Sequence, residues 1–198
     1  MYEPGSGTKI SEHKDERMDE LLVMVNGLPG AGKSTLGRSL ARELDAWFLS
    51  KDAVKEALAS CVDGAGALDA LGGIAMDTVW ALAQAIPGDV VIDSWWFAPR
   101  DSSFVRAGLD RVGAVRAVEV WCDVPAEVAR ARYASRTRAD LYRDEEHLAA
   151  DWGRWAAGAE PLGLTATVVV ETNGPVDCVR LASRIRSVAE PLDDAARR

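Results

Sequence analysis

Short apolar runs alternate along the chain with amphipathic stretches of helical length. The apolar runs lie at 21–25, 47–49, 89–93, 115–122 and 166–171. Because they are continuous rather than alternating, they are typical of strands buried on both faces of a sheet. Between them the pattern predicts helices over 33–44, 53–59, 68–86, from Pro99 onwards, and over 125–138, 145–157 and 176–189. Regular alternation of strands and helices predicts an α/β fold: a parallel sheet with helices on both faces.

The two ends of the chain differ from its middle. Residues 1–20 are mostly polar and show no periodicity, which predicts a mobile N-terminal tail. Residues 21–190 form one predicted domain, because a chain of 198 residues is typical of one domain and contains no repeat or low-complexity block. Residues 191–198 are predicted to be a second, C-terminal tail.

A glycine-rich segment follows the first apolar run and opens the first predicted helix. Its sequence, Gly-Leu-Pro-Gly-Ala-Gly-Lys-Ser over 27–34, fits the phosphate-loop pattern G-x-x-x-x-G-K-[ST]. Glycines let the backbone close around phosphate oxygens, Lys33 can reach the β- and γ-phosphates, and the Ser34 hydroxyl can bind Mg²⁺. A chance match is disfavoured by this strand-to-helix context. The predicted nucleotide-binding residues here are Gly27, Gly30, Ala31, Gly32, Lys33, Ser34 and Thr35.

Charge and cysteine content narrow the classes of partner. Acidic residues outnumber basic ones by 31 to 23, for a net charge of −8, so nucleic acid and anionic membranes are not expected partners. No apolar run reaches the ~18 residues of a membrane span, and the N-terminal segment lacks an apolar signal core. The three cysteines are widely spaced and odd in number, which favours a reducing cytoplasm over a disulfide framework or a zinc site.

Two sequence features favour phosphate transfer over hydrolysis or guanine-dependent switching. The chain contains no Asn-Lys-x-Asp motif, which reads guanine in many GTPases. The third apolar run ends in Asp93-Ser94, so the glutamate that primes water in many ATPases is absent there. A kinase is therefore favoured over an ATPase or GTPase.

The order of several short motifs resembles a known family. The segments 27–35, 49–55, 91–93 and 122–125, followed by Arg132 and Arg136, resemble the small P-loop kinases of the adenylate-kinase-like group. The likeness covers roughly residues 21 to 190 and is strongest to the branch of polynucleotide 5′-kinase domains, zeta-toxin kinases and chloramphenicol phosphotransferase. It implies a three-layer fold with a five-stranded parallel sheet, ATP or GTP as phosphate donor, Mg²⁺, and an arginine-bearing helical lid at about 133–157.

Asp52 matches the position where this branch places its general base. Phosphoryl transfer to an alcohol needs a carboxylate that orients the hydroxyl and accepts its proton, with Lys33 on the donor phosphates. The alternative is that Asp52 only caps the following helix. Lys55 lies one turn further on the same predicted helix. The resemblance implies an arginine there that contacts the acceptor or a phosphate. A lysine keeps the positive charge but cannot form the bidentate hydrogen bonds of a guanidinium.

Two more aspartates end predicted strands. Asp93 lies at the sheet edge where ligands bind in open α/β folds, so it can hold Mg²⁺ through water or orient the acceptor hydroxyl. The alternative is a turn-forming residue. Asp123 precedes Val-Pro and a helix, and there a capping role is favoured.

Aromatic residues mark the expected acceptor side. Trp95, Trp96 and Phe97 follow Asp93 directly, and three consecutive aromatic rings cannot all face one core. At least one is expected to line an acceptor pocket, the alternative being a packed hinge. The pair Trp152 and Trp155 is instead expected to pack in the core, because the two rings are three residues apart on a helix.

Four arginines crowd the end of the helix predicted over 125–138. Arg132 and Arg136 are four residues apart and are expected to share a face. The resemblance makes Arg132 a residue on the adenine or phosphate side of the donor and Arg136 the catalytic lid arginine, with Arg138 and Arg143 as other candidates. The alternative is a solvated face whose arginines pair with Glu127, Asp140 and Asp144.

A polar turn follows the last predicted strand. In the family this loop packs against the donor base, which implicates Thr172, Asn173 and Gly174 in nucleotide binding. These residue types also make an ordinary strand-to-helix turn, and both interpretations can hold.

Together these features predict an ATP- or GTP-dependent O-phosphotransferase. It would move the γ-phosphate to a hydroxyl of a nucleoside, a sugar or an antibiotic, and inactivation of an antibiotic is one possible role. The predicted acceptor-binding residues are Asp52, Lys55, Asp93, Trp95 and Trp96. Two alternatives remain open at this point: a polynucleotide or tRNA end kinase, and a nucleotide-binding regulatory switch.

Overall fold

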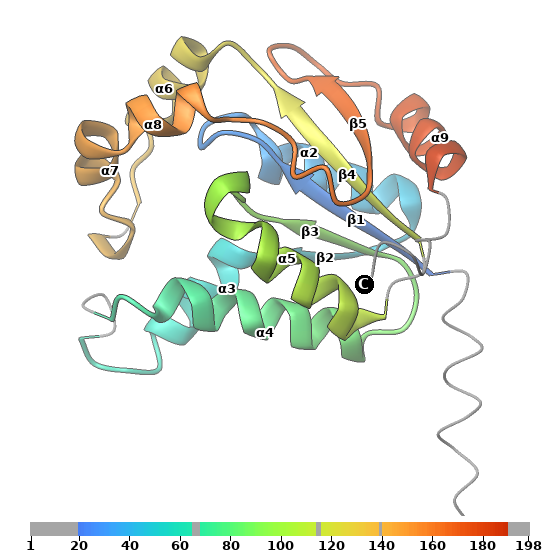
Figure 1. Ribbon diagram of the computed structural model, residues 1–198, viewed down its shortest axis with the longest axis horizontal. Helices are drawn as coiled ribbons and strands as arrows, with labels where there is room; N and C mark the ends of the chain where they lie inside the picture. Colours follow the sequence, from blue (N-terminus) through green and yellow to red (C-terminus); the bar gives the residue numbers. More distant parts are fainter. Residues whose placement is uncertain (1–19, 65–67, 114–115, 139, 190–198) are drawn as a thin grey trace, which may run out of the picture.

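A five-stranded parallel sheet forms the centre of the computed structural model (Figure 1), which describes residues 20–64, 68–113, 116–138 and 140–189. Its strand order is β2-β3-β1-β4-β5, and every pair of neighbours is parallel. The strands are β1 Leu21–Asn26, β2 Trp47–Ser50, β3 Val90–Asp93, β4 Arg116–Asp123 and β5 Ala166–Glu171. The predicted parallel α/β sheet is confirmed.

Helices cover both faces of this sheet and give it three layers (Figure 1). On one face α4 and α5 pack, and on the other α2, α6, α8 and α9 pack. The helices are α2 Lys33–Leu44, α3 Lys51–Ala59, α4 Leu71–Ala85, α5 Ala98–Val112, α6 Ala126–Ala134, α7 Asp144–Ala150, α8 Trp152–Ala157 and α9 Cys178–Val188, with a short 3₁₀ turn η3 at Asp140–Tyr142. None of them is long and apolar enough to cross a membrane, as far as the described residues extend.

The central strand β1 is buried along its whole length, because both of its faces carry apolar side chains. Val23 packs into one core and Met24 into the other. On the Val23 side, Leu36, Leu40 and Leu44 of α2 recur every four residues and form one buried stripe. This packing holds the start of α2 against the carboxyl end of β1, where the phosphate loop lies.

Two expected helix caps are wrong. Helix α3 begins at Lys51, and its cap is the Ser50 hydroxyl, which accepts from the Ala53 backbone N–H at 3.5 Å. Asp52 therefore lies inside the first turn and does not cap the helix. Asp123 does not cap α6 either, because it is still part of β4 and its carbonyl accepts from the Thr172 N–H at 2.8 Å.

Several helix ends also differ from the pattern. The helix expected to reach residue 138 ends at Ala134, so Arg132 and Arg136 do not share a helical face. The helix expected over 145–157 is split at Asp151, whose carboxylate contacts His147 at 2.8 Å and the Arg154 guanidinium at 2.7 Å. The helices expected over 68–86 and 176–189 span 71–85 and 178–188.

The expected tails fall almost wholly outside the described residues. Only Glu20 of the predicted N-terminal tail is described, and its carboxylate accepts from the Gly88 N–H at 2.8 Å. The rest of the two predicted tails, residues 1–19 and 191–198, lies outside the described residues.

Candidate active site

The phosphate loop turns from the end of β1 into α2, and its glycines are required by its shape. Gly30 has a φ of +90°, and a side chain there would collide with the carbonyl oxygen of Ala129 in α6. Gly27 has a φ of +138°, and a Cβ there would lie 2.7 Å from the Cys122 carbonyl oxygen. The loop is therefore packed against β4 and α6 in a conformation that glycine adopts without strain.

Lys33 lies buried inside this loop. Its Nζ donates hydrogen bonds to the carbonyls of Gly27 and Leu28, both at 2.9 Å. Burial lowers the pKa of Lys33, and the nearby charge of Asp93 opposes that shift. Burial likewise raises the pKa of Asp93, against the opposing effects of Lys33 and of a hydrogen bond from Ser34. The ammonium and the carboxylate thus attract each other through a poorly solvated site, where charges act strongly.

The oxygen atoms beside Lys33 fit a magnesium ion. The Asp93 carboxylate is buried, interacts with the Ser34 hydroxyl and lies 3.5 Å from the Ser50 hydroxyl. Mg²⁺ prefers such oxygen donors and is completed in kinases by substrate phosphates and water. Within the described residues, no cluster of three or more histidine, cysteine or acidic side chains could hold a metal ion by itself. Phosphate and water oxygens would therefore complete the ligands of a magnesium ion here.

A groove of about 510 Å³ runs from the phosphate loop to the turn after β5. The Arg132 guanidinium crosses it and donates to the Thr172 carbonyl at 3.2 Å and to the side-chain oxygen of Asn173 at 3.3 Å. Gly174 lines the same groove. The structure therefore brings the predicted donor-side residues together beside the loop.

On the other side of Lys33 lies a narrow cavity of about 180 Å³, here called the transfer cavity. Its walls include the predicted residues Asp52, Lys55 and Asp93, and Arg136 also lines it. Arg136 lines the donor groove as well, so it stands between the two spaces. The side chain of Asp52 is about half exposed to this cavity and its opening, at 49%.

Arg138 makes the contacts that orient Asp52. Its guanidinium donates to Asp52 Oδ2 at 2.9 Å and to both carboxylate oxygens of Asp144, at 2.7 and 2.8 Å. It also stacks 4.0 Å from the ring centroid of Tyr142. The sequence offered Arg138 as an alternative to Arg136, and only the structure shows the pairing with Asp52.

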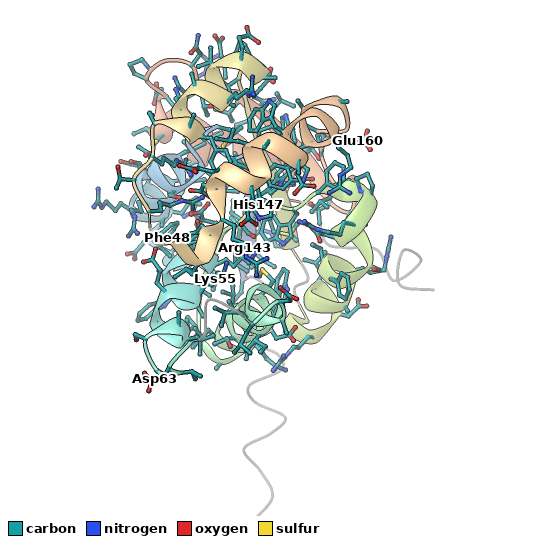
Figure 2. The ribbon with its side chains drawn as sticks, turned by 90° about the vertical axis from the view of Figure 1, so that its left-hand side faces the viewer. Phe48, Lys55, Asp63, Arg143, His147 and Glu160 are labelled. Atoms are coloured by element: carbon teal, nitrogen blue, oxygen red, sulfur yellow. The ribbon has the colours of Figure 1, made fainter. Side chains whose placement is uncertain are left out.

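The segment 133–157 contacts α3 at its turn η3. Lys55 Nζ donates to the Leu141 carbonyl at 3.1 Å, and the Tyr142 hydroxyl donates to Glu56 at 2.9 Å. Figure 2 shows Lys55 and Arg143 close together where this segment meets α3. Residues of the expected lid segment, including Tyr142, Asp144 and His147, therefore line the transfer cavity.

A family model described as an AAA domain matches residues 22–162. The chain belongs to this AAA domain family. Similar solved structures include a protein of Chloroflexus aurantiacus j-10-fl at 20% identity, with a TM-score of 0.65, covering 85% of this chain and 98% of that one. A gluconokinase from Sinorhizobium meliloti 1021 is 21% identical, with a TM-score of 0.54 and coverage of 88% and 95%. Shikimate kinase from Acinetobacter baumannii is 18% identical, with a TM-score of 0.52 and coverage of 88% and 94%.

At these identities the likeness shows the fold. This AAA domain protein has the three-layer fold of the small P-loop kinases of the adenylate-kinase-like group, as the resemblance implied. The narrower likeness to the phosphotransferase and toxin branch stays a prediction.

In the aromatic loop of this AAA domain protein, the two tryptophan rings lie in different surroundings. Trp95 lines the transfer cavity, whereas Trp96 is 3% exposed and stacks on Trp80 of α4 with ring centroids 6.3 Å apart. Trp152 and Trp155 are buried in the core as expected, and Trp155 also reaches the transfer cavity.

The sequence reasoning missed a buried network beneath the site. Asn26 donates to Glu119 at 2.8 Å, and its side-chain oxygen accepts from the N–H groups of Gly27 and Trp96 at 2.8 and 3.0 Å. Glu119 also accepts from the Leu162 N–H at 2.8 Å, and burial raises its pKa. A charged residue inside the apolar run at 115–122 was the signal that could have revealed this network.

Proposed function

We propose that this protein is a kinase that moves the γ-phosphate of ATP or GTP to a hydroxyl group of a small molecule. The observation that carries the proposal is the position of Asp52. Its carboxylate shares one cavity with Lys33, the phosphate-loop residue that reaches the β- and γ-phosphates. A carboxylate facing the γ-phosphate is what transfer to an alcohol requires.

Asp52 would orient the acceptor hydroxyl and accept its proton as the new P–O bond forms. Arg138 holds the Oδ2 oxygen, which leaves Oδ1 for the hydroxyl. Lys33 and Arg136 would neutralise charge on the transferring phosphoryl group, because both line the transfer cavity and carry a positive charge. Ser34 and Asp93 would hold Mg²⁺, which neutralises phosphate charge when bound.

A small acceptor is favoured over a nucleic-acid end. The transfer cavity is narrow, and the chain as a whole carries a net charge of −8. The gluconokinase and the shikimate kinase with similar folds are named for hydroxylated small molecules. A sugar, a nucleoside or the hydroxyl of an antibiotic belongs to the same class. The free cysteines Cys61, Cys122 and Cys178 are in keeping with work in the cytoplasm.

The test is a transfer assay with the whole chain. Purified protein is incubated with Mg²⁺, with ATP or GTP, and with panels of nucleosides, sugars, sugar acids and aryl alcohols, and products are analysed by mass spectrometry. We expect one added phosphate on an alcohol, and none with Lys33→Ala. Phosphorylation of RNA or DNA 5′-ends alone, or steady hydrolysis without any phosphorylated acceptor, would overturn the proposal.

A further inference from the structure

A second cavity of about 570 Å³ adjoins the transfer cavity between α4 and α5, and we call it the α4–α5 cavity. The two cavities share Lys51, Ser94, Trp95 and Arg100 as lining residues. A molecule seated in the larger space can therefore extend one group past Trp95 toward Asp52. The narrow transfer cavity alone is too small for most drug-sized molecules, which occupy about 300–1,000 Å³.

The walls of the α4–α5 cavity are mainly apolar and aromatic. Trp80 and Trp96 form a stacked pair in its depth, with Met76 beside them. Phe104 also lines this cavity and is 69% exposed, so its ring is accessible to a ligand. Rings of this kind favour a flat apolar body, because offset stacking adds to the free energy of burial.

Two consecutive glycines keep this space open. Gly72 and Gly73 lie in the first turn of α4, neither has a positive φ, and both line the cavity. A Cβ on Gly73 would meet nothing within 4 Å, and one on Gly72 only the Lys51 ammonium at 3.8 Å. In a helix glycine is about 1 kcal/mol less favourable than alanine. Neither the backbone nor the packing requires glycine here, and the two glycines leave this part of the cavity wall without side chains.

Three buried polar donors belong to residues that line the α4–α5 cavity. The Ser94 hydroxyl and the indole N–H of Trp96 are buried, the two residues being 6% and 3% exposed, and neither has a hydrogen-bond partner among the described residues. The indole N–H of Trp95 is likewise buried and has no hydrogen-bond partner among the described residues. Buried donors are normally satisfied, so these three point to oxygen acceptors on a ligand. Lys51 adds a positive charge that forms no ion pair with another described residue.

We propose that the α4–α5 cavity binds the body of the acceptor, and that this acceptor is an alcohol bearing a flat apolar ring and oxygen acceptors. The assignment rests on the proposed kinase function, since it places the reacting hydroxyl at Asp52.

The first test compares matched ligands. Phenyl β-D-glucoside and methyl β-D-glucoside differ only in the ring, and their affinities for the full chain are measured by ligand-observed NMR with ADP and Mg²⁺ present. Burial of a phenyl ring should give at least about tenfold tighter binding of the phenyl compound. Equal affinities would overturn the proposal.

The second test fills the cavity. Gly73→Leu places a side chain in the open space, and Gly153→Leu is the matched control. Gly153 also lies in the first turn of a helix, α8, and has no atom near its Cβ position, but it does not line the cavity. Both substitutions raise helix propensity, so both proteins should melt at or above the wild-type temperature.

Gly73→Leu should abolish the advantage of the phenyl compound while ADP affinity stays unchanged, and Gly153→Leu should behave as wild type. Unchanged phenyl glucoside binding by Gly73→Leu would show that the ring lies elsewhere and would overturn the assignment. The two proposals fail differently. If ring binding is lost in Gly73→Leu but wild type phosphorylates no alcohol, the cavity stands and the kinase function falls. If wild type and Gly73→Leu phosphorylate phenyl β-D-glucoside equally well, the function stands and the cavity assignment falls.

Discussion

The donor side and the acceptor side of the site are built in different ways. The phosphate cradle on the donor side is one continuous segment, 27–34, formed by main-chain groups and glycine conformations. The acceptor side is assembled from side chains far apart in sequence. Arg138 and Asp52, which form its central ion pair, are 86 residues apart.

This difference shows which part of the site is tied to the fold and which part is free to vary. The loop must fit against Ala129 and Cys122, so its residues are determined by close packing as well as by phosphate. A side chain at Gly73, which lines the α4–α5 cavity, would instead meet open space. Changes there can alter the acceptor without disturbing the nucleotide site.

Lys33→Ala should have the largest effect, because Lys33 lines the transfer cavity and belongs to the donor loop. Phosphate transfer should fall by on the order of 10⁴, and donor binding should weaken too, since the lysine contacts phosphates in both ground and transition states. Steady-state kinetics measure the rate of phosphate transfer, and nucleotide titration measures donor affinity. Full activity in this variant would mean that the loop does not bind the donor phosphates.

Arg136→Ala should lower kcat by on the order of 10³ with little change in donor Kd, because an arginine that meets charge in the transition state acts on turnover. Arg138→Ala should act instead on the acceptor side, by releasing Asp52, and should lower kcat less. Arg138→Lys should not restore the loss, because lysine cannot bridge Asp52 and Asp144 with a planar fork. A larger kcat loss in Arg138→Ala than in Arg136→Ala would reverse the two roles.

Asp52→Asn should lower turnover by about 10², the usual range for loss of a general base. The fold should survive, because Ser50 and not Asp52 caps α3. Asp93→Asn is the comparison and should raise the Mg²⁺ requirement. Turnover and melting temperature are measured at several Mg²⁺ concentrations. Normal turnover in Asp52→Asn with a dead Asp93→Asn would identify Asp93 as the base.

Glu119→Gln should have the smallest effect on catalysis and a clear one on stability. The amide nitrogen cannot accept, so one of the hydrogen bonds from Asn26 and Leu162 is lost, at about 1–3 kcal/mol of unfolding free energy. Glu171→Gln, at an exposed position on β5, is the control and should stay near wild type. Urea unfolding measures the unfolding free energy of both variants.

The unfolding free energies of the wild-type protein and Glu119→Gln should also differ in their pH dependence. Burial raises the pKa of Glu119 above its unfolded value of about 4.3, so the folded state binds more protons above that pH. The wild-type unfolding free energy should therefore fall, relative to Glu119→Gln, as pH rises from about 4.3 through the raised pKa. A difference that is constant or grows with pH would contradict a raised pKa.

Much of the fold was predictable because it depends on local and periodic signals. The continuous apolar run at 21–25 could only be a doubly buried strand, and Pro99 and the phosphate-loop glycines marked helix starts. The errors lie at helix ends. Ser50 and Asp52 are both good caps, and the backbone path out of β2, paired to β3 through Ser50 and Asp93, decided between them.

The sequence by itself determined the sheet, the phosphate loop and Lys33, since each depends on residues adjacent in the chain. Tertiary structure decided the rest of the site. It placed Arg138 on Asp52, joined Asn26 to Glu119 under the loop, and left Gly73 facing open space. No sequence interval encodes these contacts, because they arise only where the parallel strands β1, β3 and β4 bring separate segments to one edge of the sheet.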